Sequence, residues 1–379
     1  MSVSASFRAA TALLLIGCLL CPPAQALVSF NDGKEHLFVT GTAGASYDSN
    51  ILAHAGGGGD TIYSAGVLLE YTRRAGLIGV DASVGVDLSQ FVNNRNENST
   101  DPRFALAFAK STGRTTGGLS LSATRENRAD SAANVRAQSW DYDTTLNLKY
   151  PVIDRYSVSG TVGYTARIYD ATSGLTNLST YSLGTDLLYA LTDTRDLAVG
   201  YRYRYEETSR NTAYDDQSVT AGVSGAILPR LSGSVRAGYQ IRSPRKQAKD
   251  GGDRGLTASA ALTWYATKRL SFTGQMSNDL SVTSTNLSMS TLSGNLGAEY
   301  VFNSKRSVSA NVGGGDNRFL GAAGLDRRDE FFTFGAGVNY TMMEHLKISL
   351  SYDYFKNWST LSYSDYDRNT FSLSLISRW

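Results

Sequence analysis

The pattern of residues 366–379 (YDRNTFSLSLISRW) constrains the fold more than any other feature of the chain. Phe371, Leu373, Leu375 and Trp379 share one parity, and polar residues fill most of the remaining positions. Such alternation predicts a β-strand with one apolar and one polar face. A barrel in an outer membrane needs its last strand to pair with its first, because an open sheet edge is unstable in lipid. We therefore expect this segment to close a barrel against a first strand that begins near Leu37.

The same alternation recurs along the chain and is clearest over residues 78–88. Its apolar face is long enough for a tilted strand that crosses a bilayer in about 11 residues. Tight turns alternate with longer polar loops, and this rhythm predicts an all-β, transmembrane, antiparallel up-and-down β-barrel of about 18 strands. Sixteen strands is the alternative if two weak segments, residues 103–110 and 117–124, do not span.

Composition excludes several other classes of protein. Beyond residue 26 no apolar run approaches the ~18 residues of a membrane-spanning helix, so a helical membrane protein is excluded. The formal net charge is +2 with lysine and arginine spread along the chain, so no nucleic-acid partner is expected. Apolar residues make up 41% of the chain and recur with period two, which argues against disorder.

The N-terminus carries the pattern of an export signal. Arg8 precedes an apolar run over residues 9–20, and Ala24-Gln25-Ala26 matches a cleavage site. We expect a signal peptide over residues 1–26 and an outer-membrane barrel of the Gram-negative type over residues 27–379. Residues 15–18 (LIGC) also resemble a lipoprotein cleavage site, but the apolar run continues past them. Both cysteines, Cys18 and Cys21, lie in this segment, so the mature chain is expected to lack thiols.

No constellation of residues predicts catalysis. We expect His36 and His345 on the periplasmic side and His54 in the first long loop on the opposite side, so they cannot meet across the bilayer. Motifs for a serine nucleophile, a zinc protease and a P-loop are absent from the sequence. Acidic loop clusters could supply some ligands for Ca²⁺, but we favour solvated loops. No enzyme activity, cofactor or metal is therefore expected, and an outer-membrane hydrolase is the least favoured function.

Charged residues on the polar parity of the strands are the candidate functional residues. The candidates expected to line the lumen are Asp141, Asp143, Lys149, Arg167, Arg202, Arg204, Glu206 and Arg236, and Asp87, Arg242, Glu299, Lys347 and Asp353 share their parity. Their mixed signs predict a hydrated, weakly selective pore, although facing charges also fit a purely structural network of ion pairs. Aromatic residues are few on this parity. A channel specific for sugars would be expected to line its path with them, so the sequence gives little evidence of saccharide binding.

Three segments give the chain a resemblance to a known family. These are residues 46–51 (SYDSNI) at the end of the first strand, residues 200–203 (GYRY) and the aromatic C-terminus. The chain resembles the EpsL-like beta-barrel porins that are encoded with exopolysaccharide systems. The resemblance implies a component of polysaccharide biosynthesis or export, with polysaccharide and periplasmic export proteins as partners beside outer-membrane lipid and the barrel assembly machinery. A general diffusion porin is the alternative function.

Overall fold

The structure, a computed structural model, describes residues 27–30, 34–74, 76–246, 248, 252–320 and 327–379. The predicted signal segment, with both cysteines, lies outside the described residues. In the described ranges the strands are β1 (Val28–Phe30), β2 (Glu35–Asp48), β3 (Asp60–Arg73), β4 (Gly79–Phe91), β5 (Ser99–Lys110), β6 (Thr116–Asp130), β7 (Val135–Ile153), β8 (Tyr156–Tyr169), β9 (Leu178–Thr192), β10 (Arg195–Thr208), β11 (Thr212–Leu228), β12 (Leu231–Lys246), β13 (Asp253–Tyr265), β14 (Leu270–Val282), β15 (Ser288–Asn303), β16 (Arg306–Leu320), β17 (Arg328–Met343), β18 (Leu346–Ser359) and β19 (Tyr366–Arg378). Three short 3-10 helices lie in loops: η1 (Arg95–Glu97), η2 (Ala171–Ser173) and η3 (Ser362–Ser364).

Strands β2 to β19 form one closed antiparallel sheet, with each strand paired to its neighbours in the chain. The ring closes where β19 pairs with β2, from Thr370 opposite Asp48 to Arg378 opposite Thr40. Main-chain bonds of 2.9 and 3.0 Å between Trp379 and Val39 extend this seam. The predicted pairing of the last strand with the first is confirmed, and so is the all-β barrel of 18 strands.

The alternative of sixteen strands is wrong. The two weak segments lie in β5 and β6, which pair in unbroken register from Arg103 opposite Thr124 to Lys110 opposite Gly117. Several strands also run further than their apolar residues indicate, so that only residues 131–134 separate β6 from β7 and only residues 209–211 separate β10 from β11. The physical reason is that a β ladder needs main-chain pairing and not apolar side chains, so the barrel wall continues beyond its apolar belt.

Strand alternation sorts the side chains between two surfaces. Leu183, Leu187, Leu197, Val199 and Tyr201 lie exposed on the outside of the barrel, on the parity that was predicted to face lipid. An exposed apolar belt of this kind suits contact with the hydrocarbon of an outer membrane. Among the described residues, no helix has the length and apolar character of a membrane span.

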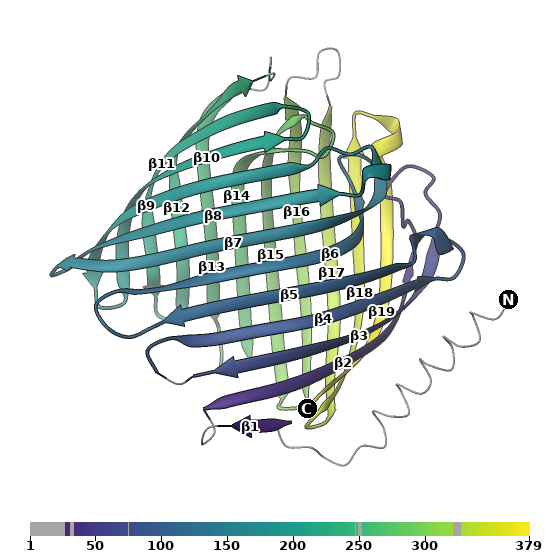
Figure 1. Cartoon of the computed structure of the whole chain (residues 1–379), viewed down its shortest axis with the longest axis horizontal. Coiled ribbons are helices and arrows are strands. Elements are labelled where there is room, and N and C mark those ends of the chain that lie inside the picture. The colour runs from purple at the N-terminus through teal and green to yellow at the C-terminus, as the bar shows by residue number, and fades with distance from the viewer. Residues whose placement is uncertain (1–26, 31–33, 75, 247, 249–251, 321–326) are drawn as a thin grey trace.

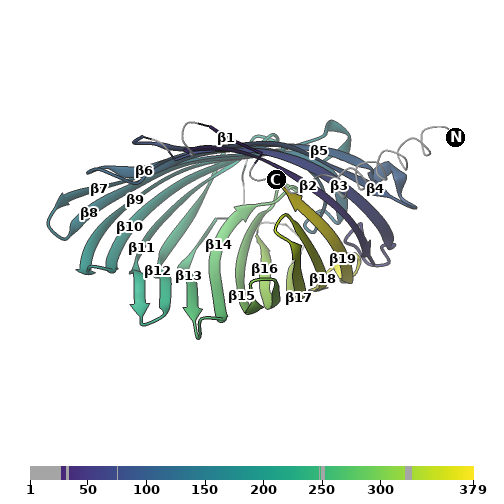
Figure 2. The same ribbon diagram turned by 90° about the horizontal axis from the view of Figure 1, so that it is seen from below.

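The strands are steeply tilted. In Figure 1, β3 to β8 on the near face run across the picture, whereas β15 to β18 on the far face run up it. Strands on opposite walls of a barrel cross in this way because all are tilted with the same hand relative to its axis. Figure 2, the view from below, shows that the molecule is flattened.

The two ends of the barrel differ in their packing. We call the end with the connections at residues 49–59, 92–98, 131–134, 170–177, 209–211, 247–252, 283–287, 321–327 and 360–365 the loop end, and the opposite end, with Trp379, the turn end. In the described ranges, every buried side chain except those of Leu188, Ala198 and Ser377 lies in these loops or in the loop-end halves of the strands. The interior is therefore filled mainly at the loop end, which longer connections identify as the outer side.

Candidate functional site

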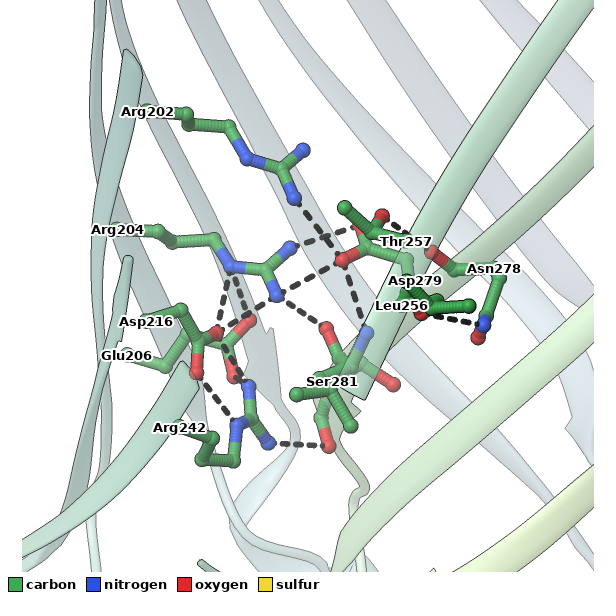
Figure 3. Close-up of polar contacts among 11 residues, drawn as sticks. Arg202, Arg204, Glu206, Asp216, Arg242, Leu256, Thr257, Asn278, Asp279 and Ser281 are labelled. Atoms are coloured by element: carbon green, nitrogen blue, oxygen red, sulfur yellow. Dashed lines mark hydrogen bonds and ion pairs between the residues drawn. The ribbon is translucent and has the colours of Figure 1, made fainter. Parts of the chain in front are cut away.

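Six charged side chains from four strands meet inside the loop end of the barrel (Figure 3). We call them the interior ion network: Arg202, Arg204 and Glu206 of β10, Asp216 of β11, Arg242 of β12 and Asp279 of β14. Strands β10 and β14 are separated in the wall by three others, so their side chains can meet only across the interior.

Local strand geometry places most of these groups. Arg202, Arg204 and Glu206 alternate along β10 and so share one face of the sheet. Across the ladder, Arg204 is the register partner of Asp216, which in turn is the partner of Arg242. The sheet therefore sets a positive, a negative and a positive side chain next to one another, an arrangement that favours cross-strand ion pairs.

Arg242 is the buried centre of the network. Its side chain is 0% exposed, and its guanidinium donates to Asp216 through Nε and Nη2, both at 2.6 Å. Nη2 also lies 2.5 Å from Glu206 Oε2. The side chains of Glu206 and Asp216 are each 7% exposed. Fork-like arginine–carboxylate pairing is directional, so it fixes the orientation of these side chains as well as their charge.

Arg204 links this centre to the opposite wall. Its Nη2 lies 2.7 Å from Asp216 Oδ2, and its Nη1 lies 3.0 Å from Asp279 Oδ2. Arg202 reaches the other oxygen of Asp279 at 3.1 Å. The network balances three guanidinium groups against three carboxylates, so it places no net charge in the interior.

The same arginines bind the main chain of β14. Arg204 donates to the carbonyl oxygen of Leu280, and Arg242 donates to that of Ser281 at 3.0 Å. At the tip of the hairpin, Asn286 accepts a bond of 2.7 Å from Thr208 at the end of β10. Leu280 is 1% exposed, whereas Met276, on the same face of β14, is 44% exposed. The loop end of the β14–β15 hairpin is therefore held inward, where it narrows the interior.

Nearer the turn end, a second ion pair runs along the inner face of the wall and joins two non-adjacent strands. Arg236 of β12 lies 2.5 Å from Asp186 of β9, and it passes over β10 and β11 to reach that residue. Gly200 and Gly222 make room for this side chain, because a Cβ at either position would lie 2.9–3.3 Å from side-chain atoms of Arg236. These two glycines thus let a long side chain lie flat against the wall.

The remaining predicted residues form separate contacts. Arg167 and Asp141, from adjacent strands, share a two-pronged bond of 2.7 and 2.5 Å. Lys149 of β7 lies 3.2 Å from Asp196 of β10, and Asp143 accepts a bond of 3.3 Å from Thr145. The structure thus joins only Arg202, Arg204 and Glu206 of the eight predicted residues in one network, together with Arg242 from the wider set on the same parity.

Sequence reasoning missed the two aspartates of the network. Asp216 shares the parity of Ser218, Thr220 and Gly222 in β11, a signal that would have placed it with the other polar interior positions. In β14, Asp279 has the opposite parity to Met276 and Leu280. Only the inward bend of the β14–β15 hairpin brings its side chain to Arg204.

A second group of loops fills the interior at the loop end. Ile51 and Ala53, in the loop between β2 and β3, are 0% and 2% exposed. Asn134, in the loop between β6 and β7, donates to the carbonyl oxygen of Ala53 at 2.6 Å and accepts a bond of 2.6 Å from Ser364. Arg327 donates to Ala132 O at 2.7 Å. Four loops from different hairpins therefore converge at the loop end.

The histidines do not form a site. His36 was expected before the first strand but lies within β2, opposite Thr72, because the ladder extends past the apolar residues. His345 stacks on Trp379 at 4.9 Å at the turn end, whereas His54 lies in the loop between β2 and β3. In the part of the chain that the structure describes, no group of three or more His, Cys, Asp or Glu side chains could hold a metal ion.

Comparison with known proteins supports the fold. A family model described as "Putative beta-barrel porin 2" matches residues 218–378, the segment from β11 to β19. The chain is similar to the structure of Pseudomonas aeruginosa OccK2 (OpdF), with 10% identity, a TM-score of 0.52, and coverage of 92% of this chain and 98% of that one. Acinetobacter baumannii OccAB2 gives 12% identity, a TM-score of 0.51, and coverage of 93% and 99%. The chain covers 62% of the FrpB iron transporter from Neisseria meningitidis, with 11% identity, a TM-score of 0.47 and 85% of this chain covered. No curated protein matches the sequence.

Proposed function

We propose that the protein is a non-enzymatic channel that lets small hydrophilic solutes diffuse across an outer membrane. One observation carries this proposal: the closed barrel is apolar outside, and ion pairs bridge non-adjacent strands across its inside. An interior of charged side chains supports a water-filled path. The match of residues 218–378 to a family of beta-barrel porins supports the same reading.

The interior ion network makes this channel narrow and weakly selective. Its six charges cancel, so it does not favour ions of one sign. Arg236 and Asp186, nearer the turn end, cancel in the same way. The inward β14–β15 hairpin and the converging loops reduce the cross-section at the loop end. We therefore expect small conductance steps and a permeability ratio for K⁺ over Cl⁻ near one.

Polysaccharide export, the function implied by the family resemblance, stays a prediction. Neither the network nor the barrel wall carries a feature that favours a saccharide over another hydrophilic solute. A general diffusion channel accounts for the apolar exterior and the charged interior without a specific substrate.

Planar bilayer recordings of the refolded barrel test the proposal. We expect stepwise currents in KCl with a reversal potential near zero across a salt gradient. Replacing Arg202 and Arg204 together by serine removes two positive charges from the interior, so the reversal potential should move towards that of a cation-selective channel. Arg254→Ser, which removes an exposed positive charge from β13, should leave it unchanged. Stable insertion without any current steps would overturn the proposal.

A further inference from the structure

One seam of the barrel is incompletely paired. Strand β13 pairs with β12 along almost its whole length, but with β14 only from Ser259 to Tyr265. Strand β14 itself continues to Val282, and its residues up to that point pair with β15. Within the described ranges the ladder between β13 and β14 therefore stops at Ser259 and Ser277, although both strands run on towards the loop end.

Contacts inside the barrel hold the unpaired part of β14 away from β13 (Figure 3). Arg204 donates to the carbonyl group of Leu280 and binds both side-chain oxygens of Asp279. Arg242 donates to the carbonyl group of Ser281 at 3.0 Å. Strand β13 meanwhile stays in the wall with β12. We call this arrangement the inward state of β14.

The sequence also allows the ladder to continue. If the register of the paired part ran on past Ser259, Leu256 of β13 would lie opposite Leu280 of β14. Side chains alternate between the two faces of a strand, so Leu280 would then face outward beside Leu256, while Asp279 would still face the interior. Leu256 is 77% exposed, so this position belongs to the apolar belt. We call this alternative the paired state of β14.

The inward state leaves a strand edge unpaired at the level of the belt. The register partner of Leu256 on β12, Tyr239, is 46% exposed and marks this level. In hydrocarbon an unpaired strand edge is costly, because its main-chain groups find no water to bind. The paired state would recover this ladder and return Leu280, now 1% exposed, to the apolar belt.

Asn278 opposes the paired state. In the inward state its side chain donates to the carbonyl oxygen of Leu256 at 2.9 Å, and its own carbonyl accepts a bond of 2.9 Å from Thr257. Asn278 has the outward parity of Leu280, so in the paired state its amide would face the apolar belt without a partner, which is unfavourable. Each state thus satisfies groups that the other leaves unpaired, and such a segment is bistable.

We infer that the loop-end part of β14 moves between the inward and the paired state and thereby gates the interior. In the inward state the β14–β15 hairpin narrows the loop end. In the paired state β14 returns to the wall and the interior widens. The two strands move together, because they stay paired up to Val282 and Ser288. The effect on conduction rests on the proposed channel, whereas the movement itself does not.

Disulfide trapping in proteoliposomes of the full barrel tests for the paired state. The pair Leu256→Cys and Leu280→Cys is introduced with Cys18 and Cys21, the two cysteines of the sequence, replaced by serine. In the inward state one position is 77% exposed on the outside and the other is 1% exposed inside, so the thiols point apart. Partners in an antiparallel ladder have Cα atoms about 4.5–5.5 Å apart, within the range of a disulfide. We expect oxidation to link this pair.

Two further cysteine pairs serve as controls. Ala260→Cys with Met276→Cys joins outward register partners in the paired part of the same seam, so oxidation should link them in either state. Leu256→Cys with Ser281→Cys has the wrong parity for a continued ladder and should stay reduced. Failure of the Leu256–Leu280 pair to link while the first control does would overturn the gate. Equal linking of the wrong-parity pair would overturn it too, because disorder and not a ladder would then bring the thiols together.

Substitutions that weaken the inward state should speed this disulfide. Asn278→Val removes the bond to Leu256 and suits the apolar belt, so the rate should rise about fivefold, the factor that corresponds to one hydrogen bond of net ~1 kcal/mol. Asp279→Asn weakens the contact with Arg204 and should also raise the rate. Asp186→Asn removes an interior carboxylate that pairs with another arginine and should not. Unchanged rates in both weakened variants would refute the two-state balance.

Planar bilayer recordings test the gate itself. The oxidised Leu256–Leu280 variant should give larger conductance steps than its reduced form, and the oxidised Ala260–Met276 control should show no change. Equal steps with and without the Leu256–Leu280 disulfide would show that the movement does not gate the interior. Absence of current from every variant would overturn the proposed channel, while the disulfide result would still decide the movement, so the two proposals can fail independently.

Discussion

Replacing Arg242 by methionine removes the centre of the interior ion network while it keeps the aliphatic volume of the side chain. The side chain of Arg242 is fully buried and pairs with Glu206 and Asp216, whose side chains are each 7% exposed. Without it, Arg204 alone balances two buried carboxylates. Removal of one partner from a buried ion pair costs about 3–5 kcal/mol, because the other charge is left without compensation.

Urea unfolding of the refolded barrel, followed by tryptophan fluorescence, measures this loss. With an m-value of ~3 kcal/mol/M, the unfolding midpoint should fall by roughly 1–2 M. Arg245→Met is the matched control, because Arg245 lies on the same strand and also pairs with an aspartate, Asp215, but its side chain is 63% exposed. Exposed ion pairs contribute little, so its midpoint should barely change.

A second substitution distinguishes lost charge balance from lost packing. Adding Asp216→Asn to Arg242→Met removes one of the two buried carboxylates that then share Arg204, so the double variant should recover part of the midpoint. Equal midpoints for Arg242→Met and Arg245→Met would refute the reasoning, since burial would then not decide the cost. A double variant less stable than the single one would show that packing, and not charge, sets the loss.

Three further changes probe the wall and its closure. Asp186→Asn leaves Arg236 without its carboxylate, so the reversal potential in a KCl gradient should move towards anion selectivity. Gly222→Ala places a Cβ 2.1 Å from a main-chain oxygen of β12, and the strain should cost ~1–3 kcal/mol in urea unfolding, whereas Gly160→Ala, which meets no atom within 4 Å, should cost clearly less. Asp48→Asn weakens the buried carboxylate that binds Arg368 across the β19–β2 seam, and the unfolding midpoint should fall by an amount equivalent to ~1–2 kcal/mol.

Local periodicity made most of the fold predictable. Alternation with period two marks a strand wherever it occurs, and it separates an apolar face from a polar one without any knowledge of distant residues. It therefore predicted the barrel, its 18 strands and the closure of residues 366–379 on the first strand. Strand ends were less predictable, because β6, β7, β10 and β11 continue through polar residues on main-chain pairing alone.

The contacts of the candidate site were only partly predictable. Parity placed Arg202, Arg204 and Glu206 on one face, and simple cross-strand register could have added Asp216. Asp279 could not be found in this way, because it lies 75 residues from Arg204 in sequence and three other strands separate β14 from β10 in the wall. Its position depends on the inward bend of the β14–β15 hairpin. No periodic pattern of apolar and polar residues marks such a bend in the sequence.

The sequence by itself determined that the chain forms a closed barrel with an apolar exterior and a charged face inside, because alternation is a property of neighbouring residues. Only the tertiary structure decided which charges meet and where the ladder stops. Those features arise when the whole ring has closed and curved, so that Arg204 and Arg242 reach across the interior to the main chain of β14. The same contacts hold the end of β14 inside the barrel, and the ladder between β13 and β14 stops at Ser259 and Ser277.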